Sequence, residues 1–185
     1  MRRGLPVQLA VEGWRCVVVG AGAAGRRKVL ALLDAGAHVR VVDPAGFPTV
    51  GLAADATERV EVLQRRWAPG DTADARMVVA ATDDEAVNQA VAAEAEVARA
   101  LVLRADQADK GDLWSPAVLR RPPVTVAIDS GGTSAGLSIV LRDEIASLLD
   151  HEAERWEELA AWAAEHHPVS SSEVAARLAE MRAAR

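Results

Sequence analysis

One stretch constrains the fold of this chain more than any other: a run of valines that leads directly into a glycine-rich turn. Residues 16–25 read CVVVGAGAAG. A continuous β-branched run without polar alternation predicts a strand buried on both faces, as in a parallel α/β sheet. We therefore expect a chain in which strands and helices alternate.

The glycines of this turn have the GxGxxG spacing of a dinucleotide-binding site. The first allows a tight turn, the second lets backbone amides approach a pyrophosphate, and the third lets the following helix pack closely. The N-terminus of that helix attracts phosphate through its free N–H groups and its dipole. A strand–helix turn that binds nothing is the alternative. The predicted cofactor contacts here are Gly20, Gly22, Ala23, Ala24 and Gly25.

A second strand, residues 38–42, ends at Asp43, which is followed by Pro44. A carboxylate about 20 residues after the glycines accepts hydrogen bonds from the adenine ribose and repels a 2′-phosphate. We therefore add Asp43 and Pro44 to the predicted cofactor contacts and expect NAD rather than NADP.

The alternation continues to about residue 105. The expected fold class is α/β, a Rossmann-type doubly wound parallel sheet with right-handed crossovers. Asp71 or Thr72 is a plausible cap for a short helix, and residues 5–9 suggest an edge strand or a tether. Further strands are expected at 60–64, 77–81 and 101–103, with a helix at 85–98.

The pattern changes near residue 113. Two short apolar segments around a basic, proline-containing turn predict an antiparallel hairpin, and a helix follows at 135–149. Ser170-x-x-Glu173 is a capping box for a last helix. We predict three parts: an NAD-binding Rossmann domain at 1–113, a small α+β dimerisation and substrate segment at 114–149, and a C-terminal helical segment at 150–185.

Charge and cysteine content exclude several classes of function. The net charge of −6 argues against nucleic acid as a partner. The single cysteine, Cys16, lies in a predicted strand, which suggests a buried apolar role and a reducing compartment. The chain has no apolar run of the length that a membrane helix needs. We expect a cytoplasmic protein that acts away from membranes.

Several polar groups are candidates for binding or chemistry. Thr82, Asp83 and Asp84 follow a buried strand, where they could line the cofactor or cap the next helix, and both roles stay open; Ala81, Thr82 and Asp83 are the predicted cofactor contacts. Asp106 follows the fifth strand and could accept a proton from a substrate, or be merely solvated. Arg120 and the turn Ser130, Gly131, Gly132, Thr133 could bind anions, or could form an ordinary hairpin and helix start.

His166-His167 has no spaced partner for a metal and more plausibly ends a helix, so no metal site is assigned. Several segments in order resemble one known family: Leu5-Pro6, Gly20-x-Gly22-x-x-Gly25 with Arg27-Lys28, residues 32–37, Ala-Thr-Asp-Asp at 81–84 with Val87-Asn88, Asp106, Pro116, and Ser-Gly-Gly-Thr-Ser at 130–134. This is the precorrin-2 dehydrogenase and sirohydrochlorin ferrochelatase family, the N-terminal module of siroheme synthase. The resemblance covers residues 5 to about 150.

The resemblance implies NAD-dependent oxidation of precorrin-2 to sirohydrochlorin, in siroheme or cobalamin biosynthesis, and it leaves ferrochelatase activity open. It further implies a homodimer, a tetrapyrrole substrate carrying eight carboxylates, and Asp106 as the catalytic aspartate. Asp106 would also serve metal insertion if Fe²⁺ or Co²⁺ is handled.

Departures from the family pattern fall near the expected substrate pocket. Leu103 replaces a usual Asn and is followed by Arg104, Ala135 replaces a Pro, and Ile139 replaces an Arg. They put chelation in doubt. Two alternatives therefore remain: a non-catalytic NAD- or tetrapyrrole-binding homologue, and a metal chelatase without redox activity.

Overall fold

The computed structural model describes residues 4–122, 124–131 and 134–183. The chain divides into two compact units, with the boundary between Trp114 and Ser115. Each unit is described by itself. The functional division into three segments remains a prediction.

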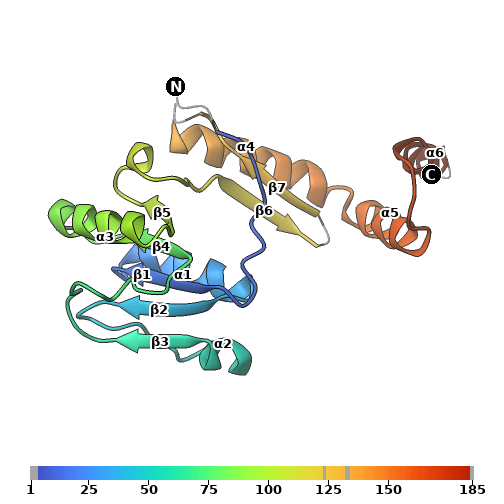
Figure 1. Ribbon diagram of the computed structural model, residues 1–185. Helices are drawn as coiled ribbons and strands as arrows, with labels where there is room; N and C mark the ends of the chain where they lie inside the picture. Colours follow the sequence, from blue (N-terminus) through green and yellow to red (C-terminus); the bar gives the residue numbers. More distant parts are fainter. Residues whose placement is uncertain (1–3, 123, 132–133, 184–185) are drawn as a thin grey trace. The chain divides into compact units, whose positions relative to one another are not determined.

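The first unit is built on a five-stranded sheet in which every pair is parallel (Figure 1). The strands lie in the order β3-β2-β1-β4-β5, and the chain reverses its direction of winding between β1 and β4. Ligands bind at such a switch point, outside the carboxyl ends of the strands. The elements are β1 Arg15–Val19, α1 Ala23–Asp34, β2 His38–Val42, α2 Ala54–Glu58, β3 Val60–Leu63, β4 Met77–Ala80, α3 Glu85–Val97, β5 Leu101–Arg104 and the 3₁₀ turn η1 Ala108–Lys110.

Alternation along the strands divides the core between the two faces of the sheet. On one face Cys16, Val18 and Val79 pack with the α1 residues Val29 and Leu33. On the other face, Val17, Val19 and Val78 pack with α3 residues that include Val91 and Ala95. The predicted doubly wound parallel fold is confirmed, because each helix covers one face and the strands between them are buried on both.

Two local expectations need correction. Asp71 and Thr72 cap no helix, because residues 69–74 form turns instead. The Asp71 carboxylate accepts hydrogen bonds from Arg65 Nη2 at 2.6 Å and from the backbone N–H of Ala68 at 2.8 Å, which closes a turn. Residues 5–9 form no strand and are a tether, one of the two alternatives.

The second unit contains the predicted antiparallel hairpin and three helices. They are β6 Ala117–Arg121, β7 Val124–Ile128, α4 Ala135–Asp150, α5 Ala153–Glu165 and α6 Ser171–Ala183. The capping box is confirmed, since Ser170 N–H donates to Glu173 Oε2 at 2.8 Å and Glu173 N–H donates to Ser170 Oγ at 3.3 Å. The His166 end of α5 also agrees with the sequence prediction.

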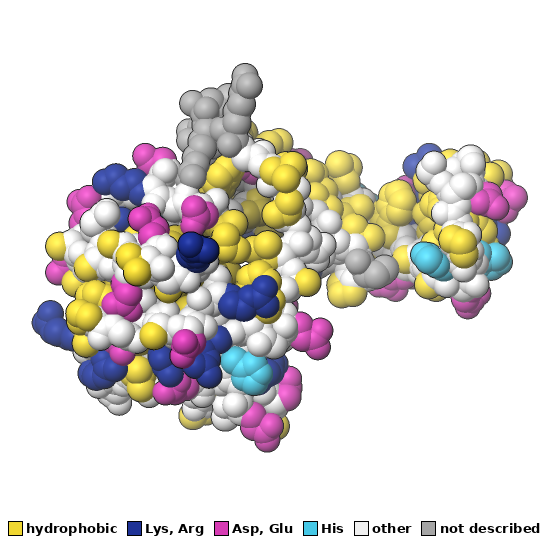
Figure 2. Space-filling model, in the orientation of Figure 1, with side chains coloured by type: hydrophobic (Ala, Val, Ile, Leu, Met, Phe, Trp, Pro, Cys, Tyr) yellow, Lys and Arg dark blue, Asp and Glu magenta, His cyan; other side chains and the backbone are white. Residues whose placement is uncertain are grey.

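Apolar side chains lie at the surface of this second unit (Figure 2). The exposed ones include Val124 of β7 and, on α4, Leu137, Ile139, Val140, Leu141 and Leu148. Of the helices that the structure describes, none is long and apolar enough to cross a membrane.

Candidate functional site

The glycine turn after β1 lies directly against the loop after β4. Gly20 has φ +92°, and a Cβ at this position would lie 2.6 Å from the carbonyl carbon of Ala81. A Cβ on Gly25 would lie only 1.8 Å from the carbonyl oxygen of Gly20. These two glycines are therefore required sterically, one by the turn and one by the approach of α1.

Gly22 is the N-cap residue of α1, and its surroundings differ. Its backbone is extended, and no side chain of the described residues caps the helix. A Cβ built on Gly22 would meet no described heavy atom within 4 Å. Ala23 and Ala24 open the helix, so the first N–H groups face a space that a phosphate could occupy.

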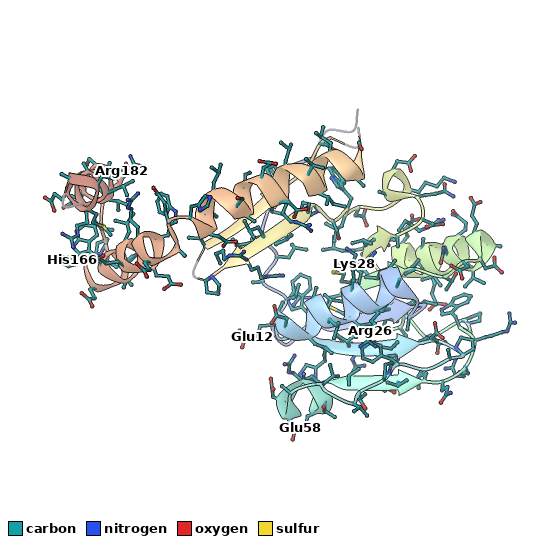
Figure 3. All side chains as sticks on the ribbon, turned by 180° about the vertical axis from the view of Figure 1, so that it is seen from behind. Glu12, Arg26, Lys28, Glu58, His166 and Arg182 are labelled. Atoms are coloured by element: carbon teal, nitrogen blue, oxygen red, sulfur yellow. The ribbon has the colours of Figure 1, made fainter. Side chains whose placement is uncertain are left out.

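Cationic side chains follow this helix end. Arg26 and Lys28 extend from the first half of α1 (Figure 3). The Arg26 guanidinium carbon lies 5.5 Å from the ring centroid of Phe47, a buried residue of the segment after β2. The end of α1 that carries the glycine turn is thus also its cationic end.

Asp43 connects the end of β2 to the glycine turn. Its Oδ2 accepts a hydrogen bond from the Ala21 N–H at 2.6 Å, and its Oδ1 accepts one from the Ala45 N–H at 2.7 Å. Each carboxylate oxygen can accept a further hydrogen bond. The half-buried carboxylate is therefore fixed beside the turn with capacity left for a ribose diol, while its neighbour Pro44 is exposed.

The loop after β4 is held by Asn88, a fully buried residue of α3. Asn88 Oδ1 accepts hydrogen bonds from the Thr82 N–H at 3.0 Å and the Thr82 hydroxyl at 2.8 Å. Asn88 Nδ2 donates to the Thr82 carbonyl at 2.9 Å. Helix capping falls to Asp84, whose Oδ1 accepts from the N–H groups of Ala86 and Val87.

These hydrogen bonds give the residues of the loop after β4 different structural roles. Asp84 takes the cap, Thr82 is bound to Asn88, and Asp83 is exposed. Ala81 donates its N–H to the Val19 carbonyl at 2.8 Å, which continues the sheet into the switch point. The cap role predicted for this loop is therefore confirmed at Asp84, while cofactor contact by Ala81, Thr82 and Asp83 stays a prediction.

Asp106 is bound to a buried arginine. Arg104 Nε donates to Asp106 Oδ1 at 2.8 Å, and Arg104 Nη2 donates to Asp106 Oδ2 at 2.7 Å. The Arg104 side chain is 0% exposed and the Asp106 side chain 26%. The Arg104 fork, together with a hydrogen bond from Asn88, holds the pKa of Asp106 well below its usual range. Asp106 is thus an ionised and weakly basic carboxylate at neutral pH.

Sequence reasoning assigned no role to Arg104, Asn88 or Gln89. The available signal was a charged residue at the end of an otherwise apolar strand, because such a residue needs a buried partner. The partners themselves lie on α3 and in the loop after β5, and no local pattern links them.

The remaining predicted residues belong to the second unit. Arg120 is an exposed residue of β6 in the second unit. Ser130 donates its hydroxyl to the Ser134 carbonyl at 2.8 Å, and Gly131 has φ +64°. Gly132 and Thr133 lie outside the described residues. Within the first unit, the structure brings together the candidates of the glycine turn, the end of β2 and the loop after β4.

Two other features bear on chemistry. Burial raises the pKa of the Cys16 thiol to about 11, which is unfavourable for a nucleophile. Among the residues that the structure describes, no group of three or more His, Cys, Asp or Glu side chains could hold a metal ion.

A groove is present at the amino ends of β1, β2 and β3, lined by residues such as Arg15, His38 and Glu61. It lies at the edge of the sheet opposite the glycine turn.

Comparisons with known proteins agree with this geometry. Residues 7–117 match the family described as "Putative NAD(P)-binding". The chain is 41% identical over 146 residues to the siroheme synthase of Chromobacterium violaceum, covering 78% of this chain and 30% of that protein. It is 37% identical over 161 residues to the siroheme synthase of Methylobacillus flagellatus, covering 87% of this chain and 34% of that protein.

The chain thus spans about a third of the length of these relatives. Among solved structures, one named "SirC, precorrin-2 dehydrogenase" superimposes with a TM-score of 0.71 at 24% identity. That match covers 96% of this chain and 89% of the other, and it supports the fold.

Proposed function

The chain belongs to the NAD(P)-binding family that includes the N-terminal module of siroheme synthases, and from this we propose that it is an NAD-dependent precorrin-2 dehydrogenase. The reaction converts precorrin-2 and NAD⁺ into sirohydrochlorin, NADH and a proton. The named relatives supply the substrate class, and the rim of the sheet supplies the chemical argument.

One observation carries the proposal: a helix N-terminus without a side-chain cap and an ionised carboxylate share one edge of the sheet. The helix N-terminus is that of α1 at Gly22, where a Cβ would meet no described atom within 4 Å. The carboxylate is Asp106, and Asn88 contacts both it and the neighbouring Thr82 loop. A dinucleotide on the glycine turn would therefore lie on the same rim as this carboxylate.

The residues present fit a dinucleotide. The α1 N–H groups would bind its pyrophosphate, Asp43 would accept hydrogen bonds from the adenine ribose, and the Ala81–Asp83 loop would lie beside it. The bound nicotinamide would accept hydride from the substrate. Asp106 would stabilise the positive charge that the tetrapyrrole acquires as hydride leaves.

This role for Asp106 differs from the proton acceptor expected from the sequence. A carboxylate whose pKa is well below its usual range is a weak base but a permanent negative charge. Metal insertion requires a group that takes protons from pyrrole nitrogens, so ferrochelation with Fe²⁺ or Co²⁺ is the less favoured activity. The proton lost on oxidation can leave to solvent.

The homodimer stays a prediction from the resemblance. The exposed apolar side chains of α4 supply the kind of surface that such an interface would bury. In the second unit, Arg120 and the turn at 130–133 remain proposed contacts for the substrate carboxylates.

The direct test incubates the purified protein with precorrin-2 and NAD⁺ and follows NADH absorbance together with the sirohydrochlorin spectrum. We expect both signals to rise in equal molar amounts. Binding of NAD⁺ and tetrapyrrole without NADH formation would contradict the proposal and favour the non-catalytic homologue. Metal insertion without NAD⁺ would favour the chelatase.

Cofactor preference provides a second prediction. Changing Asp43 to Asn removes the charge that repels a 2′-phosphate, while one side-chain oxygen still accepts a backbone hydrogen bond. We expect the ratio of kcat/KM for NAD⁺ over NADP⁺ to fall by about tenfold or more. Steady-state kinetics with both cofactors measure this ratio.

The matched control is Asp34→Asn, an exposed carboxylate at the other end of α1. Its ratio should equal that of the unchanged protein. An unaltered ratio in Asp43→Asn would separate Asp43 from cofactor selection.

A further inference from the structure

The carboxyl end of β5 carries an arginine in a position that is unusual for a charged residue. Leu103 and Arg104 are consecutive in the strand, so their side chains point to opposite faces of the sheet. Leu103 joins the core that α1 covers. Arg104 lies on the face covered by α3, and its side chain is 0% exposed.

The buried guanidinium is bound on two sides. Two of its nitrogens form the fork on Asp106, and Nη1 donates to Gln89 Oε1 of α3 at 3.1 Å. The backbone between the paired residues is also fixed, since the Ala105 N–H donates to the Ala80 carbonyl at 2.9 Å. A planar fork on a carboxylate sets the orientation of that carboxylate as well as its charge.

Other charged groups surround the pair without replacing either partner. Glu85 at the start of α3 and Asp109 of η1 are negative charges near Arg104. The Lys110 Nζ of η1 lies 3.6 Å from Glu85 Oε1. If Arg104 were removed, Asp106 would therefore face mainly negative neighbours, and its ionised form would be disfavoured.

We infer that Arg104 is a positioning residue for the proposed dehydrogenation: it fixes the plane of the Asp106 carboxylate and keeps that carboxylate charged at the rim. This rests on the proposed function. Under this inference, Arg104 affects the hydride-transfer step through Asp106. It does not affect dinucleotide binding, because Arg104 faces α3, whereas the glycine turn follows β1.

The experiment replaces Arg104 with Gln and follows the Asp106 carboxyl carbon by ¹³C NMR during a pH titration, with Asp106→Asn identifying the signal. In the unchanged protein we expect the Asp106 signal to stay that of a carboxylate through the pH range in which an ordinary Asp titrates. In R104Q we expect its midpoint to rise to the ordinary Asp value of about 3.9 or above. Kinetics of the same variant should show kcat reduced about tenfold or more, with KM for NAD⁺ unchanged.

Two further variants keep the inference falsifiable. R104K retains the charge without the fork, so we expect it to keep the low Asp106 midpoint, lose kcat, and serve as the test if R104Q does not fold. Arg65→Gln is the matched control, because it removes the bidentate pair with Asp71 in the same unit. It should leave both the Asp106 midpoint and kcat unchanged.

The outcomes separate the inference from the proposed function. If the unchanged protein forms no NADH, the proposed function fails, while the titration still decides whether Arg104 controls the charge of Asp106. An equal Asp106 midpoint and an equal kcat in R104Q and the unchanged protein would overturn the inference. Equal losses of kcat in R104Q and Arg65→Gln would also overturn it, since that result indicates general destabilisation.

Discussion

Replacing Asp106 with Asn is expected to lower kcat for NADH formation by about 10²- to 10³-fold, the range typical for losing one preorganised electrostatic group. Asn has the shape of Asp and keeps one oxygen for Arg104, so the change removes mainly the negative charge. The affinity for NAD⁺ should be unchanged, because the proposed cofactor contacts lie on the glycine turn, at Asp43 and in the Ala81–Asp83 loop. Steady-state NADH formation and NAD⁺ calorimetry measure the two effects.

The control for this prediction is Asp109→Asn. Asp109 is an exposed carboxylate in η1, three residues further along the same loop. Its kcat should stay within about twofold of the unchanged protein, as is usual for surface positions. A kcat for Asp106→Asn within about threefold of the unchanged value would instead support a non-catalytic homologue.

Asn is preferable to Ala at this position because Arg104 is buried. Both substitutions remove the negative charge opposite Arg104, but Ala also removes both hydrogen-bond acceptors of the buried guanidinium, whereas Asn keeps one, so Ala is the more destabilising change. Asp106→Ala would therefore unfold part of the population and confuse a loss of chemistry with a loss of structure. Thermal unfolding of both variants distinguishes the cases, with the lower Tm expected for Ala.

The sheet could be predicted because its signals are local. Apolar, valine-rich runs at 16–19 and 77–79 identify strands buried on both faces, and the capping box at Ser170 identifies a helix start. The prediction at Asp71 and Thr72 was wrong because a cap residue and a turn residue have the same local composition. Here Arg65, six residues earlier, binds the Asp71 carboxylate and holds it in the turn.

The sequence could predict which loops carry the candidate site residues, but not which side chains contact one another there. The GxGxxG spacing and the acid after β2 follow from backbone geometry that is common to dinucleotide-binding sheets. Arg104 and Asp106 are only two positions apart, but the burial of Arg104 and its bond to Gln89 depend on how α3 packs over β5, which no residue pattern specifies. The consequence for Asp106 is large, since the same carboxylate is a plausible base without Arg104 and a poor one with it.

Changing Gly25 to Ala is expected to disrupt the glycine turn itself. The added Cβ would lie 1.8 Å from the Gly20 carbonyl oxygen and 2.9 Å from its carbonyl carbon, so backbone must move. We expect a loss of about 2 kcal/mol or more of unfolding free energy, as for an overpacked core. The affinity for NAD⁺ should fall about tenfold or more, because α1 and the turn separate. Chemical denaturation and NAD⁺ calorimetry test both expectations.

Gly22→Ser provides the matched contrast within the same motif. Its side chain would extend into space that no described residue occupies, and serine is a favourable N-cap, so stability should be equal or slightly higher. The same side chain would occupy the N–H groups that a pyrophosphate needs, so we expect the NAD⁺ affinity to fall about tenfold or more. We therefore expect Gly22→Ser to lose NAD⁺ affinity and keep its Tm, whereas Gly25→Ala should lose both. This difference would separate the cofactor contact at Gly22 from the packing contact at Gly25. Unchanged NAD⁺ binding by Gly22→Ser would exclude the start of α1 as the phosphate site, and with it the cofactor geometry on which the proposed oxidation depends.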